Sequence, residues 1–110
     1  MKFVENEHTR LLGNAMDAYT LRQRMTTTNI ANMDNPEYNR VGVSFEEELQ
    51  DAEGRNLDQI NAEVVEHEQR PVMEDEMMEM ADTQIRVQLV TRSLRHNFNM
   101  LRSSITGRAH

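Results

Sequence analysis

The sequence predicts an all-α protein in which two long terminal helices pack as an antiparallel, coiled-coil-like pair, joined by a short acidic middle segment. Apolar residues recur at helical spacing in the first and last thirds, and prolines bound these thirds on their inner sides. At 110 residues the chain fits one small domain. We divide it into an N-terminal helix over 1–34, an irregular, partly extended acidic linker over 35–72, and a C-terminal coiled-coil helix over 73–110.

The N-terminal segment is predicted to form an amphipathic helix over about residues 5–33, with small side chains on one face. Alternating steps of four and three residues along this face give Leu11, Ala15, Ala18, Arg22, Met25, Asn29 and Asn32, with Ile30 in a neighbouring row. The alanines would allow a partner helix to approach closely, whereas buried asparagines are costly. We therefore expect Asn29 and Asn32 to have fixed hydrogen-bond partners or to mark the helix end, before Pro36.

The C-terminal segment carries the longer apolar pattern. The same steps give Met73, Met77, Met80, Gln84, Val87, Thr91, Leu94, Phe98, Leu101 and Ile105, which is typical of a coiled-coil seam. A flanking row widens the apolar surface and consists of Met78, Ala81, Ile85 and Leu89. Acidic residues in the first turn and arginines near the end both favour the helix dipole. This helix is therefore predicted to contact more than one neighbour.

The middle segment holds weaker signals. Val41, Val43 and Phe45 alternate with small residues, which predicts a brief extended stretch. Ser44 followed by Glu47 resembles a capping box and predicts a short helix over about 45–53. The pattern at Leu57, Ile60, Val64 and Val65 leaves helix and strand both open.

Charge is distributed unevenly along the chain. The net charge is -7, with +1 over residues 1–33, -13 over 34–82 and +5 over 83–110. A strongly negative middle argues against nucleic acid as the main partner. The arginines of the C-terminal helix are therefore interpreted as a solvated face, or as a surface that meets the acidic middle of a neighbouring copy.

The residues offer no constellation for catalysis or cofactor binding. With no cysteine, disulfides, thiolate zinc sites and cysteine nucleophiles are excluded. Glu66, His67 and Glu68 form a possible metal cluster, but adjacent side chains point in different directions, so a polar loop is favoured. We predict no enzyme, catalytic residue, metal or cofactor. No segment has the length of a membrane span or the apolar core of a signal peptide.

Three stretches resemble the bacterial flagellar axial proteins, and among them the proximal rod proteins of the basal body. The first is Ala18–Arg24 followed by Asn29–Asn32, and the second is Asn35–Tyr38. The third runs from Asp82 to Gln88 and from Arg92 to Ile105. Glu37 stands where the family pattern has glycine, so a turn requiring positive φ would be strained there.

The resemblance implies a non-enzymatic structural subunit that polymerises through its terminal helices to build the rod, and so contributes to motility. Such proteins are exported through the flagellar type III apparatus without a cleaved signal peptide and reside in the periplasmic part of the basal body. The implied partners are other copies of the chain, the rod proteins FlgC and FlgF, the basal-body protein FliE and the export apparatus, with no nucleic acid and no small-molecule substrate.

The predicted contact residues of this assembly are the seam positions of the two helices. They are Leu11, Ala15, Ala18, Met25, Asn29, Ile30, Asn32, Met77, Met80, Val87, Leu94, Phe98, Leu101 and Ile105. An alternative interpretation is a soluble helical adaptor or chaperone-like module that uses its methionine-rich stripe as a binding groove.

Overall fold

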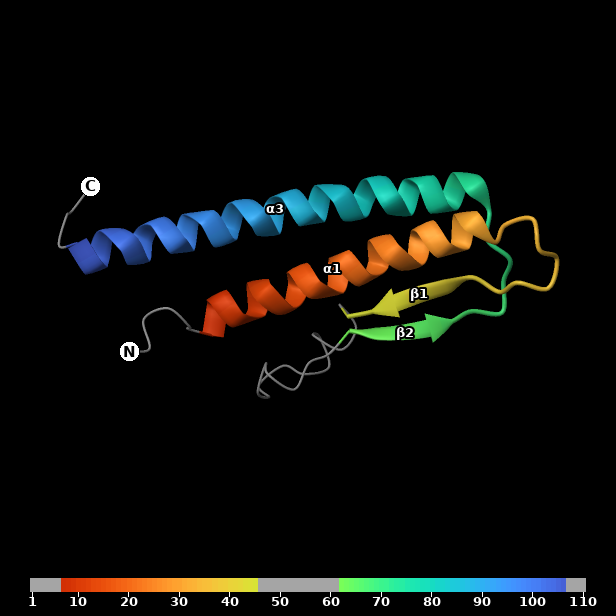
Figure 1. Ribbon diagram of the computed structural model, residues 1–110, viewed down its shortest axis with the longest axis horizontal. Coiled ribbons are helices and arrows are strands. Elements are labelled where there is room, and N and C mark those ends of the chain that lie inside the picture. Colours follow the sequence, from red (N-terminus) through yellow and green to blue (C-terminus); the bar gives the residue numbers. More distant parts are fainter. Residues whose placement is uncertain (1–6, 46–61, 107–110) are drawn as a thin grey trace.

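The computed structural model describes residues 7–45 and 62–106. Helix α1 (Glu7–Ala31) is followed by strand β1 (Val41–Ser44), strand β2 (Glu63–Glu66) and helix α3 (Met73–Thr106). The two helices lie side by side and run in opposite directions, and the strands lie along α1 on the side away from α3 (Figure 1). The predicted fold class, a mostly helical antiparallel pair, is therefore confirmed. The molecule is elongated, measuring 60 × 27 × 18 Å.

Helix α1 ends at the asparagine-rich turn that the sequence predicts. The backbone N–H of Met33 donates to the carbonyl of Ile30 at 3.3 Å, and the Arg70 guanidinium donates to the carbonyl of Met33 at 3.0 Å. The first bond satisfies a carbonyl that the helix end leaves without an intrahelical partner, and the second holds the turn that follows. The chain therefore leaves α1 in a defined direction.

The turn after α1 closes with Glu37 at its third position. The N–H of Tyr38 donates to the carbonyl of Asn35 at 3.1 Å, and the N–H of Glu37 donates to the Asn35 side-chain oxygen at 3.1 Å. Pro36 stands second, where its fixed φ suits a turn. The turn thus forms without the glycine of the family pattern.

The two strands pair antiparallel, and the predicted extended stretch is present. Val43 is opposite Val64, and Gly42 is opposite Val65. The open choice for Val64 and Val65 is therefore resolved in favour of a strand. The pairing of the two segments also includes the residue before β1, since the N–H of Arg40 donates to the carbonyl of Gln69 at 2.8 Å. The short helix predicted over about 45–53 lies outside the described residues.

The apolar core is small and lies on both sides of α1. Its buried members are Ala15, Ala18, Tyr19, Phe45 and Val90. The rings of Tyr19 and Phe45 meet edge to face, with centroids 6.3 Å apart. Ala15 and Ala18 of α1 are buried in the same cluster as Val90 of α3. Helix α1 is therefore the middle layer between α3 and the strands.

The face of α3 that is buried against α1 is offset from part of the predicted seam. Glu76, Thr83 and Val90 are buried against α1, one residue before the predicted Met77, Gln84 and Thr91. Among the other seam positions, Met80, Val87, Leu94 and Leu101 are partly buried, as is Thr91, whereas Met73 is exposed. At the start of α3 the shift has a physical reason: Asn29 of α1 and Arg40, which precedes β1, are hydrogen-bond donors that bind the Glu76 carboxylate and would not bind a thioether.

Candidate assembly surface

A buried polar junction joins three elements at the closed end of the helix pair. The side chain of Asn29 is 0% exposed and forms a pair of hydrogen bonds with the backbone of Val41. Its amide nitrogen donates to the Val41 carbonyl at 2.8 Å, and its oxygen accepts from the Val41 N–H at 2.8 Å. The same oxygen accepts from the Tyr38 hydroxyl at 3.4 Å. Asn29 therefore joins α1 to β1 in one register.

Glu76 connects this junction to α3. Its carboxylate is 0% exposed and accepts from Asn29 Nδ2 at 3.0 Å and from Arg40 Nε at 2.9 Å. A buried charge without partners would be strongly destabilising, so the arginine and the amide are needed together. The contact fixes the first turns of α3 against α1 and the segment before β1.

Arg22 makes a second cross-link about two turns before Asn29 in α1. Its guanidinium donates to the Val43 carbonyl at 2.9 Å and lies 3.6 Å from a carboxylate oxygen of Glu79. It also lies 5.4 Å from the centre of the Tyr19 ring, within the range of a cation–π contact. Arg22, like Asn29, therefore holds β1 on one side and α3 on the other.

The exposed surface of α3 is rich in large apolar side chains. They are Met73, Met77, Met78, Ile85, Leu89, Phe98, Met100 and Ile105. Met78 and Ile85 each stand two residues after a buried residue, which places them about 200° around the helix, away from α1. The helix thus carries apolar residues on its far side as well as toward its partner.

Two patches at opposite ends of α3 combine exposed apolar residues with charge of opposite sign. We define the acidic end patch as Met73, Met77 and Met78 with the exposed carboxylates of Glu74 and Asp75. We define the basic end patch as Phe98, Met100 and Ile105 with the exposed guanidiniums of Arg95 and Arg102. Between the two patches lie Ile85 and Leu89, which are also exposed.

Arg86 is held by its own helix between the two patches. Its Nε donates to a carboxylate oxygen of Asp82 at 2.8 Å, four residues earlier. This hydrogen bond, with a smaller contribution from Tyr19, raises the pKa of Arg86 above its ordinary value. The residue therefore stays charged at every physiological pH.

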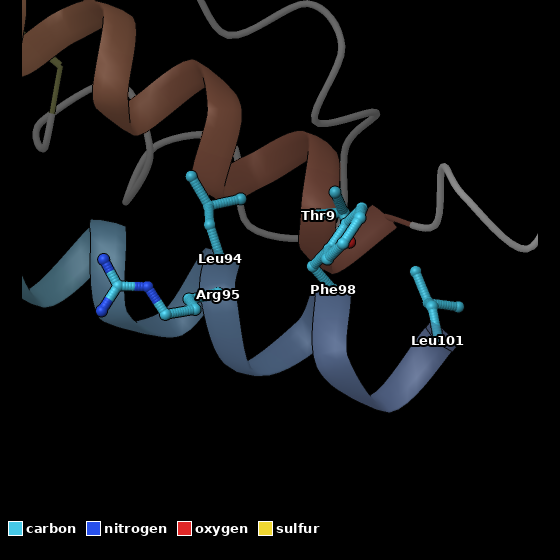
Figure 2. A pocket seen from close by; sticks show the side chains of 5 residues that line it. All are labelled: Thr9, Leu94, Arg95, Phe98 and Leu101. Carbon is cyan, nitrogen blue, oxygen red and sulfur yellow. The ribbon is translucent and has the colours of Figure 1, made fainter. Parts of the chain in front are cut away.

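At the open end, α3 extends past the first turn of α1 (Figure 1). An open apolar groove lies there, lined by Thr9, Leu94, Arg95, Phe98 and Leu101. Figure 2 shows Leu94, Phe98 and Leu101 pointing toward the side on which Thr9 and α1 lie. Phe98 nevertheless remains 61% exposed. The groove is continuous with the basic end patch, because the two share Phe98 and Arg95.

The structure distributes the predicted contact residues over three environments. Ala15, Ala18 and Asn29 are buried within the chain. Partly buried are Leu11, Met25, Ile30, Asn32, Met80, Val87, Leu94 and Leu101. The exposed ones are Met77, Phe98 and Ile105. Only the last group has most of its surface available for contact with another chain, and whether any of these residues contacts a second copy stays a prediction.

The expectation that Asn29 and Asn32 have fixed partners is confirmed. Asn32 Nδ2 donates to the Thr28 carbonyl within α1 at 2.8 Å, while Asn29 binds other elements. Sequence reasoning did not find Glu76, because it was counted among the acids of a solvated first turn. Its partner Arg40 is 36 residues away in sequence. No local pattern joins positions that far apart.

The described residues hold no group of three His, Asp or Glu side chains that would converge on a metal ion. Glu66 ends β2 and accepts from Asn39 Nδ2 at 3.2 Å, and His67 and Glu68 follow it, exposed. Within this part of the chain, neither helix is long and apolar enough to cross a membrane. Comparison with models of protein families and with curated protein sequences found no match.

Proposed function

We propose that this chain is a structural subunit of the proximal rod of the bacterial flagellar basal body, of the FlgB type. It polymerises through its terminal helices after type III export and has no enzymatic activity. Its place is the periplasmic part of the rod, in contact with copies of itself, with FlgC, FlgF and FliE. It acts without a cofactor.

One observation carries this proposal: α3 exposes more large apolar side chains than the described residues bury in their core. Eight such residues are exposed on α3, whereas five hydrophobic residues are buried among the described positions. A single small domain gains nothing from such a surface in water, and extensive exposed apolar surface marks interaction sites. A subunit of a polymer would bury it against its neighbours.

The axial-protein resemblance supports the same function through Asn29. In the Asn29–Asn32 stretch, the first asparagine is the buried residue that registers α1 against β1 and α3. Polar residues buried at helix contacts specify one register at some cost in stability. A rod subunit needs one fixed shape, because each copy must fit the same lattice.

The test is whether the chain co-purifies with detergent-extracted basal bodies. A tagged wild-type chain is expected in the rod fraction, and Phe98→Asp is expected to be exported but absent from it. Phe98→Leu is the matched control, because it keeps an apolar side chain at the same position, and it is expected to incorporate. Absence of the wild-type chain from basal bodies would contradict the proposal.

A helical adaptor is the second candidate, and the exposed methionines of the acidic end patch favour it. Flexible thioethers suit promiscuous peptide binding. This function predicts a compact monomer or dimer that is fully helical when purified and captures a discrete partner. A rod subunit would gain helix on assembly instead. Circular dichroism with sedimentation, before and after assembly, separates the two.

A further inference from the structure

The two ends of α3 are complementary in charge and alike in exposing apolar residues. Its first ten residues, 73–82, hold five acidic side chains and no basic one, whereas 83–106 hold four arginines and no acid. Of the five acids, Glu76 is buried against Arg40, Glu79 lies near Arg22 and Asp82 binds Arg86, which leaves Glu74 and Asp75 as exposed carboxylates with no ion pair inside the described chain. At the other end Arg95 and Arg102 are exposed.

We propose that the acidic end patch of one copy docks on the basic end patch of a second copy, so that copies associate head to tail. The inference deepens the proposed function and rests on it for the place of this contact in a rod. Methionines of one patch would cover Phe98 and Ile105 of the other. The exposed carboxylates and guanidiniums would pair around this apolar contact.

Charge selects this pairing over the others available to two identical chains. Two acidic end patches repel one another, and so do two basic ones. Opposite patches attract, which speeds encounter and fixes orientation more than it raises affinity. Because exposed charges are screened by salt, the association should weaken as ionic strength rises.

The positions of the patches on α3 favour an open chain of copies. Met73 and Phe98 are 25 residues apart, which is close to seven whole turns, so they point about 20° apart around the helix. Met77 and Ile105 point within about 40° of Met73, so Met73, Met77, Phe98 and Ile105 share one side of α3, and Met73 and Phe98 are about 38 Å apart along its axis. A copy that is displaced by that length and turned so that its patch faces back can repeat the contact without closing a ring.

A closed antiparallel pair is disfavoured by the residues between the patches. On that side of α3 lie Gln84, which is exposed, and Thr91, which is partly buried. Two copies packed face to face along the whole helix would bury these polar groups at a cost. Displaced copies that touch only at their ends leave them in water.

The test uses two charge-reversed chains and their mixture. Arg95→Glu with Arg102→Glu makes both ends acidic, and Glu74→Lys with Asp75→Lys makes both ends basic. Each variant alone is expected to associate about tenfold more weakly than wild type at low salt, because like ends now meet. An equimolar mixture is expected to recover association, because the acidic ends of one variant can dock on the basic ends of the other.

Sedimentation velocity is the readout, with circular dichroism confirming that each variant is folded. Wild type is expected to form species larger than a dimer, which shrink as salt is added. The proposal is overturned if wild type stays monomeric, if it stops at a dimer, if the variants associate like wild type, or if the mixture recovers nothing.

The outcome is separable from that of the proposed function. Loss of charge-dependent association, in a chain that still co-purifies with basal bodies, overturns the docking and leaves the rod subunit standing. Charge-dependent association in a chain that is absent from basal bodies supports the docking and overturns the rod function.

Discussion

Asn29 shows how much one side chain can determine in a fold with a small core. Its amide uses both its donor and its acceptor across element boundaries, toward the Val41 backbone and the Glu76 carboxylate. Removing it would leave a backbone N–H, a carbonyl and a buried carboxylate each short of a partner. Such unsatisfied groups cost about 1–3 kcal/mol each, more when charged.

Replacing Asn29 with Leu is therefore expected to lower the free energy of unfolding by about 3 kcal/mol. Leucine would also remove the two hydrogen bonds that set the register of α1 against β1. Urea denaturation followed by circular dichroism measures the free energy of unfolding.

Asn32→Leu is the matched control, because Asn32 binds only a carbonyl of its own helix. It is expected to cost less than about 1 kcal/mol. Equal losses for the two variants would show that the junction does not contribute as described.

At Thr83 a substitution is expected to raise the free energy of unfolding instead of lowering it. Its side chain is 0% exposed and its hydroxyl has no hydrogen-bond partner among the described residues. Thr83→Val keeps the shape and removes the hydroxyl, so we expect a gain of about 1 kcal/mol, seen as a higher Tm. Thr83→Ala, which also removes a methyl group, should not show this gain. A lower Tm for valine would mean that the hydroxyl is bound to a group such as an ordered water.

At the scale of elements, the sequence predicted what each segment forms better than which face it buries. Helical periodicity, Pro36 and Pro71 placed both helices, and alternation placed β1. The face of α3 was mistaken because apolar residues occupy more than one side of that helix, so periodicity alone does not select the side toward α1. The buried Glu76 depends on Arg40 and Asn29, which only the folded chain brings together.

The corrected face of α3 separates two substitutions that the sequence treats as equivalent. Leu94 packs against the core, whereas Phe98 is exposed. Leu94→Asp is therefore expected to destabilise the isolated chain by about 3 kcal/mol, because it buries a charge. Phe98→Asp should change the stability of the monomer by no more than about 0.5 kcal/mol.

Both variants are expected to abolish assembly and motility, the first through folding and the second through contact. Urea denaturation of the purified chains and swarming of cells that carry each variant measure the two effects. Full motility with Phe98→Asp would contradict an assembly role for that position.

For the whole molecule, stability should be graded from one end to the other. The closed end has the polar junction and two strands, whereas the last turns of α3 extend past α1. Segments with few buried contacts open at lower free energy. Amide hydrogen exchange is therefore expected to be slowest around Asn29 and Glu76 and fastest, within the described part of α3, after about residue 98.

Assembly should remove this gradient at the end of α3, since a docked neighbour would cover Phe98 and Ile105. Exchange measured on free and assembled chains tests it. If the amides in the last turns of α3 are already fully protected from exchange in the monomer, the adaptor function is favoured instead.

The polar junction at the closed end also sets the angle between the two helices, and a change of that angle moves the far end of α3 the most. From Glu76 to Thr106 the axis of α3 spans about 45 Å, so a tilt of about 5° at the junction moves the far tip by about 4 Å. Between these ends α3 turns buried Thr83 and Val90 and partly buried Val87 and Leu94 toward α1. A small change of angle at the hydrogen-bonded base is therefore amplified at the tip of α3, where the basic end patch lies.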